Sequence, residues 1–451
     1  MIKKIFSFGI IEGLAKALNV GMMLLLPFIV SVDLYAEINL LISIQIIAVS
    51  VIIFGMDRAV LRFLKDHNKH VFWDSFISIW LRIVVIAIPL IIIGFLLWKG
   101  STSYIYTAIL LALLIVLQGI RQIKVAASRA MHVAKKFFVY RLLTQISIFT
   151  LVIVSLLIYP DPTIFLLAFC LAILPFVFQK INLTQLKLEN KKALFEKIIF
   201  AFSWPLVFHT IGNTLLMSID RIVLYEYLGK EDVAVYSLGY TFGASLTFIY
   251  AISNAYFEPK LIKIEGKLKD QREKILSSYT SIQIILAALA ALLLVLITPY
   301  IITNFYEESY LKSLPIIVIV MLTHFLNPIY LQANFRLMNI KKTKFIAISS
   351  FLSGGFNLVL NIVFLEYGYG IMGAAYATFI AYLMLILITY VFSIVKSKTS
   401  FYMKDIMYLL GTVLVASFGL YYYESTLVVL SLTAGLIILH IFNIKEVRKI
   451  L

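Results

Sequence analysis

Long apolar stretches alternate with short polar segments along almost the whole chain of 451 residues. A helix needs about 20 mostly apolar residues to cross the hydrocarbon core of a bilayer. The pattern therefore predicts an all-α integral membrane protein with fourteen transmembrane helices. The predicted spans are 5–30, 38–56, 76–98, 104–120, 142–159, 162–179, 198–219, 233–257, 279–303, 314–335, 345–365, 370–395, 406–422 and 427–444.

The basic residues of the connections gather on one side of this predicted membrane. Of the 39 Lys and Arg residues, 33 lie in the N-terminus, the even-numbered connections and the C-terminus, and 4 lie in the odd-numbered connections. Lys and Arg collect on the cytoplasmic side of membrane proteins, so both termini are predicted to be cytoplasmic. The net charge of +16 is then explained by membrane orientation, without a nucleic-acid partner.

Composition excludes several classes of protein. With 62% hydrophobic and 14% charged residues, the chain has too little charge to cover a water-soluble surface. The lone Cys170 allows no intramolecular disulfide and no thiol–metal cluster. The six His residues show no H-E-x-x-H spacing, and no P-loop motif occurs. We expect neither a metal nor a nucleotide cofactor.

The predicted outer connections are short, and the longest covers about residues 220–232. An enzyme that acted outside the membrane on a lipid-linked sugar would need a large outer loop to build its site, so an enzyme is not expected. The start of the chain imitates a signal peptide. Glu12 and Lys16 interrupt its apolar run, which favours a retained first helix.

Two short passages recur six predicted spans apart. Residues 129–133 read Arg-Ala-Met-His-Val, and residues 336–340 read Arg-Leu-Met-Asn-Ile. The segments that begin at Asp33 and Asp232 give a second, weaker echo. An even number of spans per repeat keeps orientation, so the two halves would be related by an axis along the membrane normal. This predicts six-helix lobes at 1–197 and 198–398, followed by two further helices within 399–451.

Charged residues inside a span are costly and usually face a cavity or a partner. In the first span, Glu12, Lys16 and Asn19 fall on one helical stripe, beside a stripe of small residues that would let another helix approach closely. Two interpretations stay open for Glu12 and Lys16. They line a cavity, or they neutralise each other near the cytoplasmic interface while Lys16 extends towards water.

The seventh span is the richest in polar residues. His209, Asn213 and Asp220 form one stripe, and Arg221 lies on an adjacent stripe with two threonines. Such a wide polar wedge on an otherwise apolar helix is unlikely to face lipid. The alternative for Asp220 and Arg221 is an interfacial ion pair that caps the end of the helix.

Other polar residues of the spans have simpler interpretations. Arg82 lies one turn into the third span and can extend to the inner interface. Four further residues are interpreted as hydrogen-bonding groups between helices: His324, Asn327, Asn357 and Asn361.

Three passages resemble the polysaccharide transporters and O-antigen flippases (Wzx-like) of the multidrug, oligosaccharidyl-lipid and polysaccharide exporter superfamily. They are SIDRIVLYEYLGKEDVAVYSLGY at 218–240, KKTKFIAISSFLSGGFNLVLNIVFLEYGYGIMGAAYATFIAY at 341–382, and IIFGMDRAVLRFL at 52–64. With the fourteen-span layout, the resemblance covers essentially the whole chain. One departure is Ala234, where the family usually has Gly; Ala is small enough for the turn to survive.

The resemblance implies two six-helix lobes that face each other across a central cavity, plus two peripheral helices. It also implies the movement of a polyprenyl-diphosphate-linked oligosaccharide from the cytoplasmic to the outer leaflet of the cell inner membrane, by alternating access. The partners would be the lipid-linked oligosaccharide, membrane lipid and polysaccharide polymerase machinery. The alternative is an ion-coupled multidrug or metabolite exporter of the same superfamily.

Within this resemblance the polar residues of the spans acquire roles. A cationic cavity would hold the diphosphate by charge-assisted hydrogen bonds, with neutral polar groups for the sugar hydroxyls. The candidates for substrate binding are Lys16, Asn19, Arg82, Asn213 and Arg221. Uphill transport without a nucleotide would need an ion gradient or product removal, and H⁺ or Na⁺ are the ions considered. The candidates for ion coupling are Glu12, His209 and Asp220.

Overall fold

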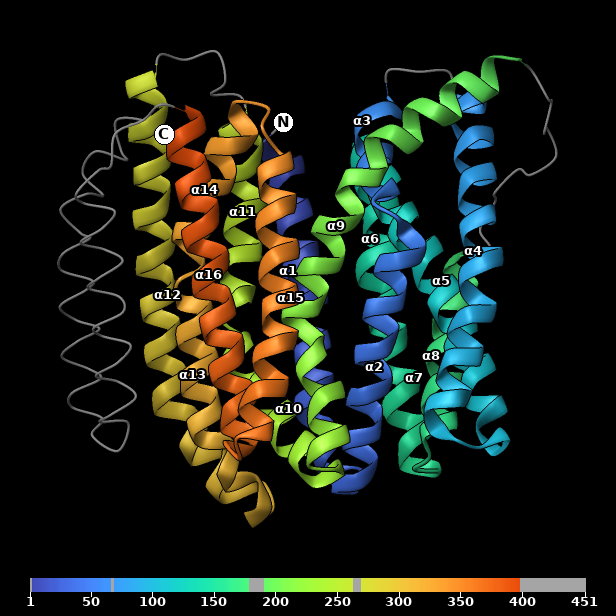
Figure 1. Cartoon of the computed structure of the whole chain (residues 1–451), viewed down its shortest axis with the longest axis vertical. Coiled ribbons are helices and arrows are strands. Elements are labelled where there is room, and N and C mark those ends of the chain that lie inside the picture. The colour runs from blue at the N-terminus through green and yellow to red at the C-terminus, as the bar shows by residue number, and fades with distance from the viewer. Residues whose placement is uncertain (1, 66–68, 178–189, 263–268, 398–451) are drawn as a thin grey trace. The chain divides into compact units, whose positions relative to one another are not determined.

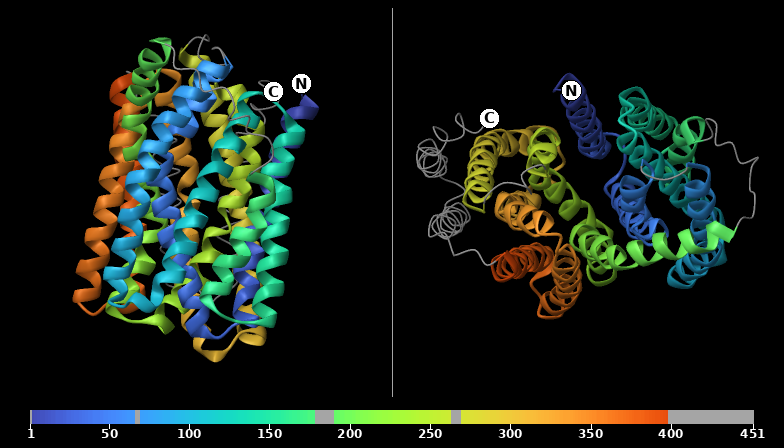
Figure 2. Two further views of the ribbon diagram at one scale, coloured as in Figure 1. Left: turned by 90° about the vertical axis from the view of Figure 1, so that its right-hand side faces the viewer. Right: turned by 90° about the horizontal axis from the view of Figure 1, so that it is seen from above.

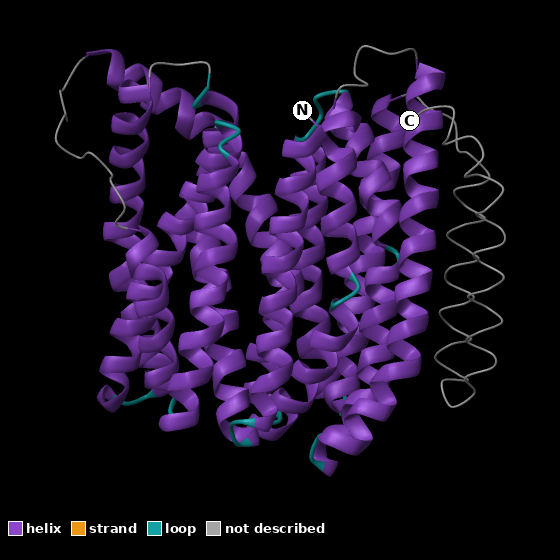
Figure 3. Ribbon diagram, turned by 180° about the vertical axis from the view of Figure 1, so that it is seen from behind, coloured by secondary structure: helices purple, strands orange, loops and turns teal. Residues whose placement is uncertain are grey.

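The computed structural model describes residues 2–65, 69–177, 190–262 and 269–397, which are helical and contain no strand (Figures 1 and 3). The helices are α1 (Ile2–Leu25), α2 (Val32–Ile53), α3 (Met56–Phe63), α4 (Lys69–Lys99), α5 (Ile105–Ala130), α6 (Ala134–Phe138), α7 (Thr144–Ile158), α8 (Pro162–Val177), α9 (Asn190–Tyr227), α10 (Lys230–Ala244), α11 (Thr247–Ile262), α12 (Lys269–Phe305), α13 (Leu314–Phe325), α14 (Asn327–Asn339), α15 (Lys344–Glu366) and α16 (Gly370–Ser397).

The predicted all-α membrane fold is confirmed in the described part of the chain. Eleven helical stretches there are long and apolar enough to cross a membrane, and α8 is a shorter apolar helix. In order, these twelve correspond to the first twelve predicted spans. The predicted spans 406–422 and 427–444 lie outside the described residues, so the count of fourteen and the predicted region 399–451 stay predictions.

Several helices extend well beyond the apolar stretches that revealed them. The connection expected at 220–232 is wrong, because α9 continues to Tyr227 and α10 begins at Lys230. In the same way, α5 continues to Ala130 and α14 to Asn339, past the predicted ends at 120 and 335. The length of an apolar run reflects the thickness of the hydrocarbon core. The helix itself can continue beyond that core, until its backbone leaves the helical conformation.

Backbone contacts group the chain into two compact units, and the helices of each run side by side (Figure 2). One unit comprises residues 14–222, and the other comprises the residues up to Gly13 together with the chain from Val223 onward. We call them the N-terminal unit and the C-terminal unit. The predicted lobe boundary at residue 197 stays a prediction.

In the N-terminal unit, α5 packs against α2, α3, α4 and α8. One apolar cluster joins α3, α4, α5 and the start of α9, with Phe72, Trp80, Ile123 and Ile199 among its buried members. This cluster packs the beginning of α9 against α3. It therefore helps to position the polar residues that follow along α9.

In the C-terminal unit, α16 packs against α13, α14 and α15, and α10 packs closely against α13. Two glycines permit that close approach. A Cβ atom at Gly239 would lie 2.9 Å from Ile316, and one at Gly243 would lie 2.8 Å from the backbone oxygen of Ile317. The two helix backbones therefore meet with no room for side chains between them at these positions.

The tenth span is broken into α13 and α14 at Leu326. Pro328 has no N–H, so the carbonyl of His324, four residues earlier, loses its helical partner. The hydroxyl of Tyr250, from α11, donates to this carbonyl at 3.0 Å. The break is thus stabilised by a neighbouring helix, and the His324 ring is enclosed between Tyr240 and Tyr382.

The repeated passages end α5 and α14 in the same type of turn, but they are out of register. His132 and Lys341 adopt the left-handed conformation. The N–H of the next residue donates to a carbonyl five residues earlier, from Val133 to Ser128 in one turn and from Lys342 to Leu337 in the other. Arg129 lies three residues before the left-handed position, whereas Arg336 lies five residues before it. The two arginines therefore lie at different positions relative to their turns.

The turn between α2 and α3 has left-handed backbone conformation and lies in close contact with α9. Phe54 and Gly55 both have positive φ, and a Cβ atom at Gly55 would lie 2.9 Å from the backbone oxygen of Ser203 and 2.9 Å from Leu206 Cβ. This turn lies within the passage 52–64 that carries the family resemblance. It requires glycine both for its conformation and for the contact with α9.

We predict that Gly55→Ala lowers the thermal stability of the purified protein by about 1–2 kcal/mol or more, because a side chain at positive φ is strained and the new Cβ meets the α9 backbone. Thermal unfolding in detergent would measure the effect. Gly94→Ala is the matched control, since nothing lies within 4 Å of a Cβ atom at Gly94 and its φ is not positive. Equal unfolding temperatures for the two variants would contradict the prediction.

Candidate functional site

The polar wedge predicted for the seventh span lies along α9. His209 and Asn213 are half-buried and one turn apart, and their Nε2 and Nδ2 atoms are 3.4 Å from each other. The hydroxyls of Thr210 and Thr214 donate to the carbonyls one turn earlier in the same helix. These threonines are satisfied by their own helix, so His209 and Asn213 are the groups at this level that can serve a ligand.

Asp220 and Arg221 lie in the body of α9, two turns before its end at Tyr227. Asp220 is fully buried and Arg221 is 7% exposed, and Arg221 Nη1 donates to the carbonyl of Met217 at 2.9 Å. The alternative of a pair that caps the helix end is therefore wrong. A buried carboxylate and a buried guanidinium in a membrane-spanning helix are costly, which is typical of functional positions.

Arg58 is a further cation that the sequence reasoning missed. It lies in α3, directly after the left-handed turn at Gly55, and forms an ion pair with Asp57 at 3.7 Å. Its positive charge also acts electrostatically on His209. The available signal was the passage 52–64, in which Asp57 and Arg58 follow the glycine.

The polar stripe of α1 is less enclosed than that of α9. Glu12 and Lys16 are half-buried, one turn apart on the same helix. Asn19 is exposed, and its Oδ1 accepts a hydrogen bond from Gln145 Nε2 at 3.4 Å. The sequence reasoning did not single out Gln145, which is 4% exposed and links α7 to α1 within the N-terminal unit.

Arg82 lies apart from these residues. Its side chain is 70% exposed, and its Nη2 atom lies 3.1 Å from Ser78 Oγ and 3.4 Å from Glu196 Oε2. These contacts join α4 to the start of α9 on the surface of the N-terminal unit. The interpretation of Arg82 as an arginine at the inner interface of the membrane stays a prediction.

The sequence of residues 1–257, more than half of the chain, matches the family described as polysaccharide biosynthesis protein. The chain belongs to this family. The match contains all eight site residues expected from the sequence. A search of proteins with curated descriptions found no match.

Solved structures similar to this family member are transporters and a flippase. A multidrug resistance MATE family transporter of the MOP superfamily, in an inward-facing conformation, has a TM-score of 0.64, is 14% identical, and aligns over 85% of this chain and 94% of its own. The lipid II flippase MurJ, in an inward closed conformation, has a TM-score of 0.63, is 20% identical, and aligns over 98% and 99%. A MOP superfamily transporter from Pyrococcus furiosus has a TM-score of 0.57 at 14% identity, over 88% and 96%. The chain therefore has the fold of MOP superfamily transporters.

This family member also buries charged groups that the sequence reasoning missed. Arg121 is 8% exposed, and its Nε donates to Gln118 Oε1 at 2.8 Å in α5. In the C-terminal unit, Arg336 of α14 and Glu273 of α12 are buried together with an N–O distance of 2.7 Å. Arg121 and Arg336 lie directly after the predicted ends of their spans, and Glu273 lies six residues before the predicted start of its span at 279. A hydropathy window assigns them to loops, although the helices continue through them.

The described residues contain no group of three or more His, Cys, Asp or Glu side chains arranged to hold a metal ion. The arrangement on α9 and α1 instead offers cations, amides and carboxylates at separate levels along membrane-spanning helices. Such groups can form ion pairs and charge-assisted hydrogen bonds.

Proposed function

We propose that this protein translocates a polyprenyl-diphosphate-linked oligosaccharide from the cytoplasmic to the outer leaflet of the cell inner membrane, for the synthesis of an envelope polysaccharide such as O-antigen. The observation that carries the proposal is the polar wedge of α9, with buried Asp220 and Arg221, in a chain of the polysaccharide biosynthesis family. A flippase needs such groups because a sugar headgroup cannot cross hydrocarbon with its hydroxyls unpaired.

In this proposal α1 and α9, the first helices of the two predicted lobes, line the path of the headgroup. Lys16 and Arg221 would bind the diphosphate through charge-assisted hydrogen bonds. Asn19 and Asn213 would pair with sugar hydroxyls, and Arg58 adds a third cation near His209. Arg82, with its exposed ion pair to Glu196, would contribute least. The lipid tail would stay in the bilayer.

Coupling to an ion gradient is a further part of the proposal. Glu12, His209 and Asp220 are the groups whose protonation, or Na⁺ binding by a carboxylate, could drive alternating access. Lipid-linked oligosaccharide would be delivered from the cytoplasm, and the polymerase machinery would consume it outside.

The test is a flipping assay in proteoliposomes that contain a fluorescent polyprenyl-diphosphate oligosaccharide, with a membrane-impermeant reagent that modifies only the outer leaflet. The purified protein should raise the rate at which the lipid becomes accessible, compared with protein-free vesicles. A parallel assay with a fluorescent organic cation tests the alternative. Export of the organic cation without movement of the lipid-linked sugar would favour a multidrug exporter and overturn the proposal.

The orientation of the chain makes a separate prediction. In a Cys170→Ala background, Lys135→Cys should be labelled by an impermeant thiol reagent only from the cytoplasmic side, because its connection is one of the basic ones. Glu307→Cys should be labelled only from outside. Both positions are exposed turns or helix starts, so access depends on the side of the membrane. Labelling of both from one side would contradict the predicted topology.

A further inference from the structure

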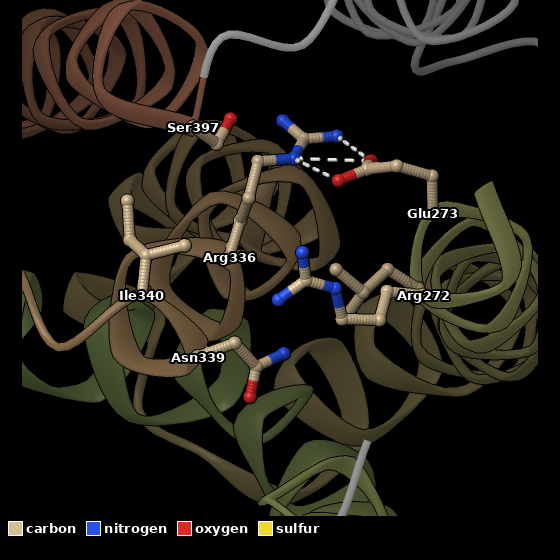
Figure 4. Close-up of a pocket in the computed structure, with 7 residues that line it drawn as sticks. Arg272, Glu273, Arg336, Asn339, Ile340 and Ser397 are labelled. Carbon is tan, nitrogen blue, oxygen red and sulfur yellow. Dashed lines mark hydrogen bonds and ion pairs between the residues drawn. The ribbon is translucent and has the colours of Figure 1, made fainter. Parts of the chain in front are cut away.

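A small pocket lies within the C-terminal unit where α12 begins and where α14 and α16 end (Figure 4). The empty space in and over this shallow pocket is about 260 Å³, a volume that includes open solvent. Its polar lining comes from Arg272 and Glu273 of α12, Arg336 and Asn339 of α14, and Ser397 of α16. The predicted topology places this end of the unit on the cytoplasmic side, and the pocket is remote in sequence from the wedge of α9.

The carboxylate of the pocket is already engaged. Arg336 Nε donates to both oxygens of Glu273 at 3.1 Å, and Nη2 donates to Oε2 at 2.7 Å. Arg336 Nη1 donates to Ser393 at 3.2 Å. These contacts neutralise the negative charge of Glu273 and occupy most of the N–H donors of Arg336. The pair as a whole is therefore neutral.

Arg272 then gives the pocket a net positive charge. Its guanidinium points into the space between Asn339 and the ion pair (Figure 4). In the part of the chain that the structure describes, Arg272 forms no ion pair. A guanidinium in a partly enclosed site, beside a second and already neutralised arginine, attracts a planar or tetrahedral oxyanion that can accept two hydrogen bonds.

Asn339 supplies an independent observation that points the same way. It is 8% exposed, and its Nδ2 has no hydrogen-bond partner among the described residues. Figure 4 shows this nitrogen directed towards Arg272. Buried amide donors are usually paired, so an oxyanion bound in this pocket would supply an acceptor for this nitrogen.

We propose that Arg272 and Asn339 bind a phosphate group in this pocket, at the predicted cytoplasmic end of the C-terminal unit. The ligand would join α12 to α14, with Glu273 and Arg336 holding the two helices in position. Three lysines follow closely in sequence, at positions 341, 342 and 344, and add positive potential for an anion. The phosphate can come from a phospholipid headgroup or from a soluble phosphate, and the experiment separates these sources.

The experiment uses the full chain purified in detergent, with two probes. Thermal unfolding is measured with inorganic phosphate against sodium chloride of equal ionic strength. Lipid retention is measured by native mass spectrometry with phosphatidylglycerol against phosphatidylcholine of the same acyl chains. Arg272→Gln removes the positive charge and the fork of guanidinium donors, and Asn339→Leu removes the amide donor. Lys274→Gln removes an exposed cation two residues from Arg272 and is the matched control.

The wild-type protein and Lys274→Gln should respond to at least one probe, and Arg272→Gln should bind that probe about tenfold more weakly or worse. Asn339→Leu should also weaken the binding of that probe. A response to phosphatidylglycerol alone identifies a lipid headgroup as the source, and a response to inorganic phosphate identifies a soluble one. If the wild-type protein responds to neither probe, or Arg272→Gln responds like the wild type, the pocket is not a phosphate site. Translocation of the lipid-linked sugar is measured separately, so either proposal can fail alone.

Discussion

Arg221→Glu is expected to reduce the translocation of lipid-linked oligosaccharide by at least about tenfold, and Arg221→Ala to reduce it less. Arg221 is buried in the body of α9 beside Asp220. Reversal of its charge would place two adjacent carboxylates where the diphosphate is proposed to bind, so repulsion would be added to the loss of a donor. Lys16→Glu should act in the same direction. The proteoliposome flipping assay, normalised to the amount of reconstituted protein, measures these effects.

Two further variants separate binding from folding. Arg221→Lys keeps the charge and should retain much of the activity, although it loses the fork of donors. Arg82→Ala removes a cation that is 70% exposed and paired with Glu196, so it should have a small effect. Size-exclusion profiles would show which variants are folded. Normal flipping by both Lys16→Ala and Arg221→Ala, at normal protein levels, would mean that these two charges are structural.

Glu273→Ala is expected to lower the stability of the protein by about 3–5 kcal/mol, because it leaves the buried guanidinium of Arg336 without its carboxylate. Arg336→Ala should cost a similar amount, since it leaves Glu273 buried without its cation. Both residues are nearly inaccessible, at 6% and 3% exposure, so removal of one partner leaves the other charge buried without its counter-ion. Thermal unfolding in detergent, together with the yield of folded protein, measures the loss.

A double variant sharpens this prediction. Glu273→Gln combined with Arg336→Met removes both charges and keeps similar volumes, so it should be more stable than either Glu273→Ala or Arg336→Ala. The matched control is Lys274→Ala, an exposed residue next to Glu273 in sequence, which should change stability by less than about 0.5 kcal/mol. If Glu273→Ala unfolds at the same temperature as Lys274→Ala, the ion pair contributes nothing to the stability of the C-terminal unit.

The position and order of the first twelve spans could be predicted from the sequence. The hydrocarbon core sets the length of an apolar run, and an unpaired backbone cannot enter it, so each run must become a helix. The polar residues of α9 were predictable for the same reason, since His209, Asn213, Asp220 and Arg221 interrupt an apolar helix at helical spacing. The passage 52–64 carried the family resemblance, but it did not predict the left-handed turn at Gly55 or the electrostatic interaction of Arg58 with His209.

The ends of the helices, and the partners of the charges near them, were decided only by the tertiary structure. Glu273 and Arg336 are 63 residues apart and lie outside their predicted spans, so no local pattern joins them. Arg129 and Arg336 align in the repeated passages, yet the turns that follow place them two residues out of register, and Arg129 is exposed whereas Arg336 is buried. The sequence by itself determined how often the chain crosses the membrane in its first twelve spans, because that depends on the solvent. Only the fold decided that Glu273 and Arg336 are buried together, because each charge needs a partner from another helix to compensate for the loss of water.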